Sequence, residues 1–129
     1  MRAKIGARLP TLVKAVTQEK IDAYAKASGD NNPLHTDPLF AAGSQFGGTI
    51  AHGMLILAYV SEMLTEAFGR RWLESGRLKV RFRAPARPGD TVTVSGQVRQ
   101  VRDGRAACPV EVRSQGQEVL LSGEAEVAL

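Results

Sequence analysis

Residues 50–68 read IAHGMLILAYVSEMLTEAF and contain the most apolar run of the chain, from Met54 to Val60. We expect this stretch to form one long helix that ends at Gly69, since a glycine commonly follows the last helical turn. Its first half leaves almost no polar face. A helix that is apolar nearly all round is normally buried, so the sequence predicts a helix buried on every side at the centre of the fold.

The residues that follow this helix show the pattern of β-strands. Apolar and polar residues alternate over 78–84, 92–98, 110–112 and 119–127, which is the period of half-exposed strands. Asp103-Gly104 is a strong signal for a tight hairpin between two of them. These patterns predict an α+β fold in which an antiparallel sheet curves around the helix. Because such a sheet leaves open edge strands, pairing into a two-fold dimer is expected.

Length and composition suit a single globular domain that covers residues 1–129. The chain is 43% hydrophobic and 23% charged. Glu62 and Glu66 interrupt the central apolar run, which is too short to span a bilayer, and the basic N-terminus lacks the apolar core of a signal peptide. Cys108 is the one cysteine, and we expect it to be a small buried apolar residue. Without an intrachain disulfide, a cytoplasmic protein with no membrane segment is expected.

The net charge of +4 points to an anionic partner. The basic residues form no block, and aromatic residues make up only 5% of the chain, whereas an RNA-binding sheet needs exposed aromatic side chains. A phosphate-rich small molecule therefore fits better than a nucleic acid. Lys79, Arg81 and Arg83 are interpreted as a solvated strand face in preference to contacts with ligand phosphates.

The segment between Ser28 and Met54 is polar, rich in turn-forming residues, and adjacent to the predicted core helix. Pro33 prevents an uninterrupted helix between Asp30 and His35, yet a rigid loop can still bring their side chains to one point. A carboxylate and an imidazole that hold the same water supply a base and an acid near neutral pH. Asn32 could orient either side chain by hydrogen bonding.

Gly53 lies at or near the start of the central helix, where backbone N–H groups lack partners within the helix. Because glycine has no side chain, a ligand can approach its amide closely. A thioester carbonyl placed there would be polarised, and an enolate forming on its oxygen would be stabilised. Water activation beside such an amide suggests the addition of water to a β-carbon, or its removal.

Each of these residues also has a structural interpretation. Asp30 alone could be a turn carboxylate, His35 a structural or solvent-facing histidine, and His52 a residue hydrogen-bonded to the neighbouring loop. A metal site formed by His35, Asp37 and His52 is chemically possible. Their spacing is not specific to zinc, so no metal is expected.

Residues 24–41, YAKASGDNNPLHTDPLFA, closely resemble the signature of the MaoC-like, (R)-specific enoyl-CoA hydratases. Phe46, Ile50 and the run Ala51-His52-Gly53-Met54 match the same family in order and approximate spacing. Weaker similarity in the strand pattern extends the resemblance over nearly the whole chain.

The resemblance implies a hot-dog fold, in which an antiparallel sheet wraps a long helix, and a homodimer or dimer-based oligomer with active sites near the subunit interface. It implies that Asp30 and His35 act on the water and that Gly53 holds the thioester oxygen. We assign substrate binding to four further residues: Ser28, Asn32, Phe46 and His52. The family hydrates trans-2-enoyl thioesters of coenzyme A or acyl carrier protein to (R)-3-hydroxyacyl thioesters, or runs the reverse dehydration, without a metal or a redox cofactor.

Two alternatives remain open. A hot-dog acyl-thioesterase would share the fold and hydrolyse the thioester, because fold alone does not decide function. A non-catalytic thioester-binding subunit of a heterodimeric dehydratase would also share it, although the presence of both Asp30 and His35 argues against a purely structural subunit.

Overall fold

Over residues 3–129 the chain forms one short strand, three short helices, one long helix, a further short helix and then the remaining strands. The computed structural model describes residues 3–129. Its helices are α1 (Gln18–Ser28), α2 (Pro33–Thr36), α3 (Pro38–Ala42), α4 (Gly53–Phe68) and α5 (Arg70–Ser75). Its strands are β1 (Leu12–Ala15), β2 (Arg77–Phe82), β3 (Thr91–Gly96), β4 (Gln100–Arg102), β5 (Arg105–Arg113) and β6 (Val119–Ala128).

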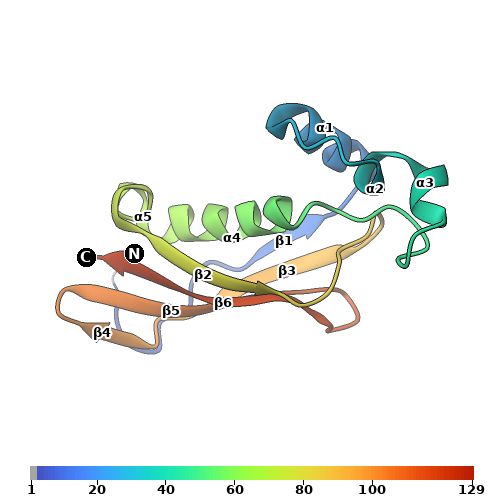
Figure 1. The fold of residues 1–129 in the computed structure, drawn as a ribbon. Helices are drawn as coiled ribbons and strands as arrows, with labels where there is room; N and C mark the ends of the chain where they lie inside the picture. The colour runs from blue at the N-terminus through green and yellow to red at the C-terminus, as the bar shows by residue number, and fades with distance from the viewer. Residues whose placement is uncertain (1–2) are drawn as a thin grey trace.

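All of these strands belong to one antiparallel sheet. The strand order is β1-β3-β5-β6-β2, and β4 pairs with β5 outside this path. Helix α4 lies along one face of the curved sheet, and α1, α2 and α3 are gathered beyond the N-terminal end of α4 (Figure 1). The predicted α+β fold, a sheet curved around one long helix, is confirmed.

The predicted hairpin at Asp103-Gly104 is also confirmed. Arg102 pairs with Arg105, so the two residues between them form the whole turn. Asp103 has a φ of 53° and Gly104 a φ of 72°. A two-residue turn with positive φ at both positions matches the right-handed twist of the strands that it joins, which explains the preference for an Asp-Gly pair here.

Helix α4 differs from its prediction in one respect that matters for function. Its sheet-facing side is buried, with Val60, Met63 and Leu64 fully inaccessible. The opposite side is not, since Met54 is 55% exposed and Glu62 lies at the surface. The expectation of burial on every side is therefore wrong for the single chain, because the sheet covers only one face of the helix. The uncovered side remains available for contact with another molecule.

The short helix α5 has no counterpart among the predicted elements. Gly69, with a φ of 60°, ends α4 and lets the chain turn directly into α5. Trp72 then packs into the core, and its indole N–H donates a hydrogen bond to Ser61 Oγ at 2.9 Å. The buried Trp72 side chain, rather than any periodic pattern, anchors α5 against α4.

Cys108 is fully buried on β5, as expected for a small apolar residue. Burial, reinforced by the negative charge of Glu124, raises the pKa of this thiol to about 11. Since the thiolate is the reactive form of cysteine, Cys108 is an inert part of the core at neutral pH.

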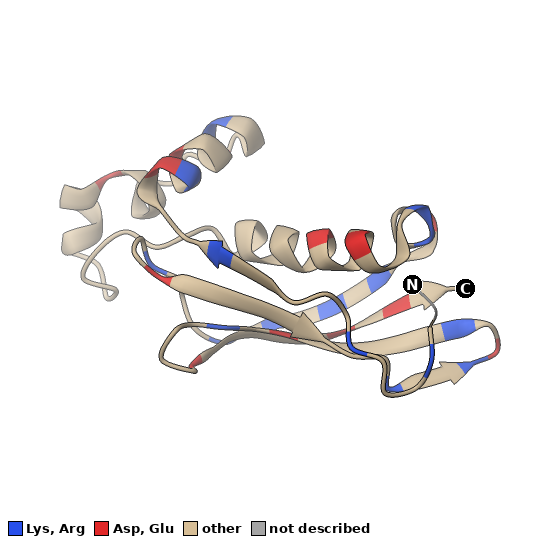
Figure 2. Cartoon of the chain, turned by 180° about the vertical axis from the view of Figure 1, so that it is seen from behind, with Lys and Arg blue, Asp and Glu red and all other residues tan. Residues whose placement is uncertain are grey.

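Charged residues are spread over the surface of the sheet and the helices. On the side that Figure 2 shows, basic and acidic residues are interspersed. Within residues 3–129, none of the helices combines the length and the hydropathy that crossing a bilayer requires.

Candidate active site

The polar segment after α1 folds as a series of capped turns above the start of α4. Gly29, with a φ of 80°, ends α1. The Asn32 side chain accepts a hydrogen bond from the Leu34 N–H at 3.0 Å and caps α2, while Asp37 caps α3. These caps give a loop of polar residues a defined shape and place Asp30 and His35 close to the N-terminus of α4.

Asp30 lies at the surface of this loop. Its backbone N–H donates to Ser28 Oγ at 3.2 Å, and its Oδ1 accepts from the Asn32 N–H at 3.3 Å. Both contacts are made to residues only two positions away, so they hold the carboxylate relative to its own turn. The carboxylate remains accessible to a ligand.

The ring of His35 is oriented by the backbone. Its Nδ1 lies 2.8 Å from the carbonyl oxygen of Ile50. Since a carbonyl oxygen can only accept a hydrogen bond, we assign the hydrogen of the neutral ring to Nδ1. The lone pair is then on Nε2, which makes this nitrogen a proton acceptor.

His52 is the N-cap residue of α4 and lies beneath this pair. Its Nε2 lies 3.0 Å from the backbone oxygen of Asp30. Its ring stacks on that of His35 with centroids 3.9 Å apart, and it also contacts the ring of Tyr24 at 4.8 Å. His52 is only 2% exposed, so it offers almost no surface to a substrate.

The structure brings Asp30, His35 and His52 together. One polar atom from each of these side chains lies within 4.8 Å of the others. A water molecule that makes ordinary hydrogen bonds of about 2.8 Å can bridge two atoms at this separation. One water can therefore contact the Asp30 carboxylate and His35 at the same time.

A metal ion fits this cluster less well than a water does. A metal needs ligand lone pairs that converge on one point. The rings of His35 and His52 are stacked with only 27° between their planes, and each has one nitrogen at a backbone carbonyl. Asp37 lies outside the cluster, because its side chain caps α3.

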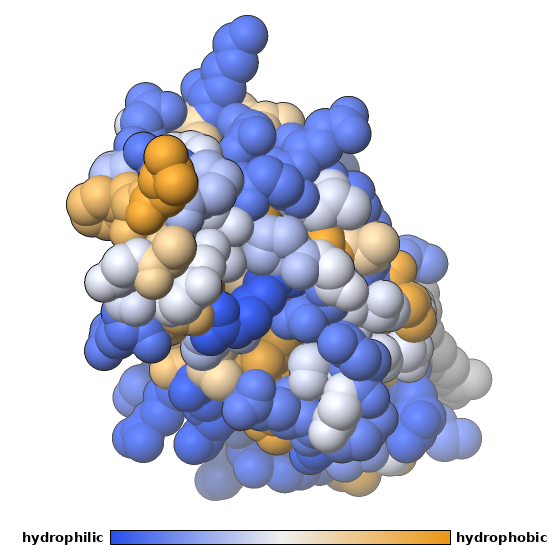
Figure 3. All heavy atoms as spheres, turned by 90° about the vertical axis from the view of Figure 1, so that its right-hand side faces the viewer, coloured by the Kyte–Doolittle hydropathy of each residue, from blue (hydrophilic) through white to orange (hydrophobic). Residues whose placement is uncertain are grey.

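Gly53, which follows His52 in the chain, borders an apolar cleft of about 290 Å³ whose lining includes Ile50 but not Asp30, His35 or His52. Its walls come from the loop before α4, from α4 itself, from the end of β2 and from β6: Phe46, Ile50, Gly53, Ile56, Phe82 and Leu120. Figure 3 shows the end of the molecule that carries α2 and α3, where apolar atoms are exposed between polar ones. The size and lining of the cleft suit a short hydrocarbon chain.

The amide of Gly53 is well placed for a ligand. The His52 side chain reaches the Asp30 backbone and does not cap α4. Among residues 3–129 we find no acceptor for the Gly53 N–H. The ring of Phe82 lies close above Gly53, since a Cβ added there would be 3.0 Å from the nearest ring atom. A side chain at position 53 would therefore press against the Phe82 ring at the wall of the cleft.

The four residues assigned to substrate binding occupy different positions. Phe46 lines the cleft, and its backbone oxygen accepts a hydrogen bond from Arg87 at 2.6 Å. Ser28 and Asn32 instead form hydrogen bonds within the loop. His52 is buried below it.

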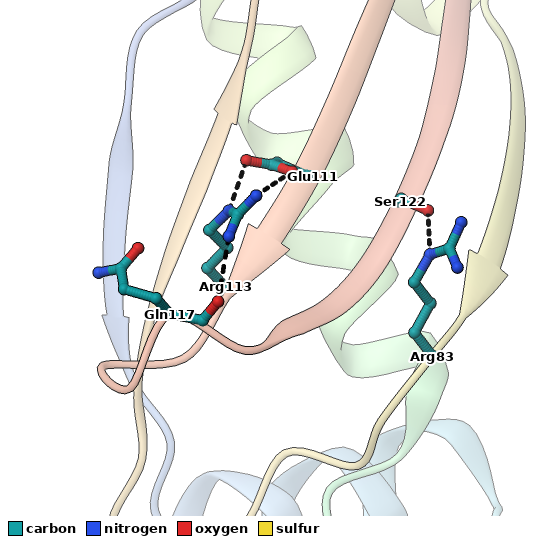
Figure 4. Close-up of polar contacts among 5 residues, drawn as sticks. All are labelled: Arg83, Glu111, Arg113, Gln117 and Ser122. Atoms are coloured by element: carbon teal, nitrogen blue, oxygen red, sulfur yellow. Dashed lines mark hydrogen bonds and ion pairs between the residues drawn. The ribbon is translucent and has the colours of Figure 1, made fainter.

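Arg83 is the member of the predicted basic strand face that reaches the cleft. Its Nε donates a hydrogen bond to Ser122 Oγ on β6 at 2.6 Å (Figure 4). A second arginine, Arg113, is paired with Glu111 of the same strand, β5 (Figure 4). Arg83 therefore lines the cleft, and its guanidinium is held by Ser122.

Gln18 supports the site and was not predicted from the sequence. Its Nε2 donates to the backbone oxygen of His35 at 2.7 Å, and its Oε1 accepts from the Thr49 hydroxyl at 2.7 Å. This one amide therefore links α1, α2 and the loop before α4. Thr17 caps α1. The position of Gln18 directly after this cap is the single sequence signal, and nothing local connects Gln18 with His35.

Comparison with known proteins finds similar sequences over most of the chain. A family model described as "MaoC like domain" matches residues 2–119. A 3-hydroxybutyryl-CoA dehydratase of Methylorubrum extorquens is 36% identical over 90% of this chain and 74% of its own length. An (R)-specific enoyl-CoA hydratase of Aeromonas caviae is 34% identical over 92% of this chain and 90% of its own length.

A solved structure shows the same architecture. The (R)-hydratase from A. caviae involved in PHA biosynthesis superposes with a TM-score of 0.84 at 31% identity, covering 98% of this chain and 96% of its own. The hot-dog fold that the resemblance implied is thereby confirmed.

Proposed function

Because this chain belongs to the MaoC-like domain family, we propose that it catalyses the reversible hydration of trans-2-enoyl thioesters to (R)-3-hydroxyacyl thioesters. The observation that carries the proposal is the convergence of Asp30 and His35 near the start of α4, where the Gly53 N–H has no acceptor among residues 3–129. This arrangement can activate a water on one side of a bound thioester and stabilise its carbonyl oxygen on the other.

In this mechanism the water lies between the Asp30 carboxylate and His35 Nε2. As the hydroxyl adds to C3, the pair takes up the released proton, and the Gly53 N–H donates to the thioester oxygen as it gains enolate character. The proton is then delivered to C2, so that one water is added in total. Dehydration follows the same steps in reverse.

The acyl group of the substrate is carried as a thioester of coenzyme A. Acyl carrier protein is the other candidate carrier of the acyl group. An anionic carrier suits the net charge of +4 and Arg83 in the lining of the cleft. We further propose that residues 1–129 act as one domain in the cytoplasm, in agreement with the single buried cysteine.

An assay with crotonyl-CoA tests this function. We expect the enoyl absorbance to decrease without release of a free thiol, because hydration leaves the thioester intact. Release of a free thiol would instead support the thioesterase alternative. An unchanged spectrum would support a non-catalytic subunit.

Replacing Gly53 by alanine is expected to lower kcat/KM about 10- to 100-fold, because the new methyl group would lie 3.0 Å from the Phe82 ring and narrow the cleft next to the amide. Steady-state kinetics with crotonyl-CoA checks this. Gly48→Ala is the matched control, since a Cβ at Gly48 meets no atom within 4 Å and its φ is not positive. Equal rates for Gly53→Ala and the wild type would remove the amide from the mechanism.

We also propose that two copies of the chain assemble as a homodimer. Strand β2 is an open edge of the sheet. Two apolar side chains nearby are more than half exposed: Phe82 at the end of β2 and Met54 on α4. Pairing of two such edges across a two-fold axis would cover them. Sedimentation equilibrium should give twice the chain mass at micromolar concentration, whereas the mass of one chain would refute the dimer.

A further inference from the structure

His52 contacts both members of the proposed catalytic pair, although it is itself buried. Its Nε2–H donates to the backbone oxygen of Asp30 at 3.0 Å, and its ring stacks on His35 at a centroid distance of 3.9 Å. With 2% of its surface exposed, the side chain cannot reach a substrate in the cleft. Any effect of His52 on the reaction must therefore pass through Asp30 and His35.

Asp30 depends on His52 for its position in the fold. The other hydrogen bonds of Asp30 within the described chain join it to Ser28 and Asn32, each two positions away. The bond to His52 spans 22 positions, and among the hydrogen bonds of Asp30 in residues 3–129 it is the one that leaves its own turn and reaches the start of α4. Without it, Asp30 would be connected to the segment before α4 only indirectly, through Asn32 and the contacts of Leu34 and His35 with Ile50.

His35 is held in a different way. Its Nδ1 bonds to the Ile50 oxygen, and its backbone oxygen accepts from Gln18. These contacts fix its ring without His52. Loss of the His52 side chain would therefore leave His35 in place and displace Asp30. The distance between the Asp30 carboxylate and His35 Nε2, which hold the water, would then change.

The other groups around His52 are consistent with a role in positioning. Tyr24 of α1 packs against its ring at 4.8 Å, and its Nδ1 is buried with no hydrogen-bond partner among residues 3–129. The ring is therefore enclosed by Tyr24 on one element and His35 on another. As the N-cap residue, it immediately precedes Gly53, so the same residue connects Asp30 with the amide site.

We propose that His52 is a positioning residue that sets the separation of Asp30 and His35 and their distance from the Gly53 amide. This inference rests on the proposed hydratase function. Misplacement of a reacting group by about 1 Å can cost about 100-fold in rate, so a residue that never touches the substrate can still determine turnover. Its substitution should lower kcat more than it raises KM.

Two substitutions separate the two contacts of His52. His52→Phe keeps a flat ring that can stack on His35 but removes the donor to Asp30, and we expect kcat for crotonyl-CoA to decrease about 10- to 100-fold with KM within about threefold of wild type. In His52→Gln the amide nitrogen can occupy the place of Nε2 and restore the hydrogen bond. We expect this variant to recover at least about half of the loss in log kcat, so that a loss of about 100-fold in His52→Phe becomes a loss of at most about 10-fold.

Phe68→Leu is the control for a loss of stability alone, since Phe68 is buried at the far end of α4. It should lower the melting temperature while kcat stays within about twofold of wild type. The inference is overturned if His52→Phe retains wild-type kcat, if His52→Gln is no better than His52→Phe, or if the loss in kcat merely follows the loss in melting temperature. A wild-type protein that does not hydrate crotonyl-CoA would overturn the proposed function and this inference together.

Discussion

Replacing Asp30 by asparagine is expected to lower kcat at least about 100-fold and to leave the fold intact. The amide oxygen of asparagine can still accept the hydrogen bond from the Asn32 N–H, so the turn is preserved. The substitution removes the negative charge and the ability to take up a proton, both of which the bound water requires. Steady-state kinetics with crotonyl-CoA and circular dichroism measure the two properties separately.

Asp103→Asn is the matched control for this experiment. Asp103 is an exposed carboxylate in the turn between β4 and β5, and asparagine tolerates its φ of 53°. This variant should have wild-type kinetics. If Asp30→Asn also turns over at near-normal rate, the proposed water activation is wrong.

Replacing His35 by glutamine is expected to have an effect of similar size, at least about 100-fold on kcat. An amide in place of the imidazole can form hydrogen bonds, but it cannot accept and return a proton near neutral pH. The expected loss is in kcat rather than in substrate binding, which competition with the unreactive analogue butyryl-CoA would measure.

His35→Asn distinguishes the chemistry of His35 from its anchoring. An asparagine amide can take the place of Nδ1 and keep the hydrogen bond to the Ile50 oxygen, but it has no group at the position of Nε2. We therefore expect His35→Asn to be as inactive as His35→Gln. A His35→Asn enzyme with substantial activity would show that the histidine acts only by holding the loop.

The sequence patterns predicted the elements that local periodicity determines. The strands after residue 77, the Asp103-Gly104 turn and the long helix all appear, because alternation and turn chemistry act over a few residues. Helix α5 was missed, since its place depends on how the Trp72 side chain packs in the core. The uncovered side of α4 was missed as well, because composition does not show how much of a helix one sheet can cover.

In the candidate site, too, the features set by local sequence could be predicted and those set by long-range contacts could not. The chemistry of Asp30, His35 and Gly53 could be proposed from residue types and from the family signature, and the structure places all three at one end of α4. The contacts that orient them could not. Gln18 reaches His35 across 17 positions and His52 reaches Asp30 across 22, and neither spacing follows any local rule.

The most direct test of the central claim follows the oxygen atom of water. Crotonyl-CoA is incubated with the protein in water enriched in ¹⁸O, and the products are analysed by mass spectrometry. If a water bound by Asp30 and His35 opposite the Gly53 amide adds to C3, the product is intact 3-hydroxybutyryl-CoA of (R) configuration. Its C3 hydroxyl then carries the label. Free crotonate with the label in its carboxylate, or an unlabelled thioester alone, would contradict it.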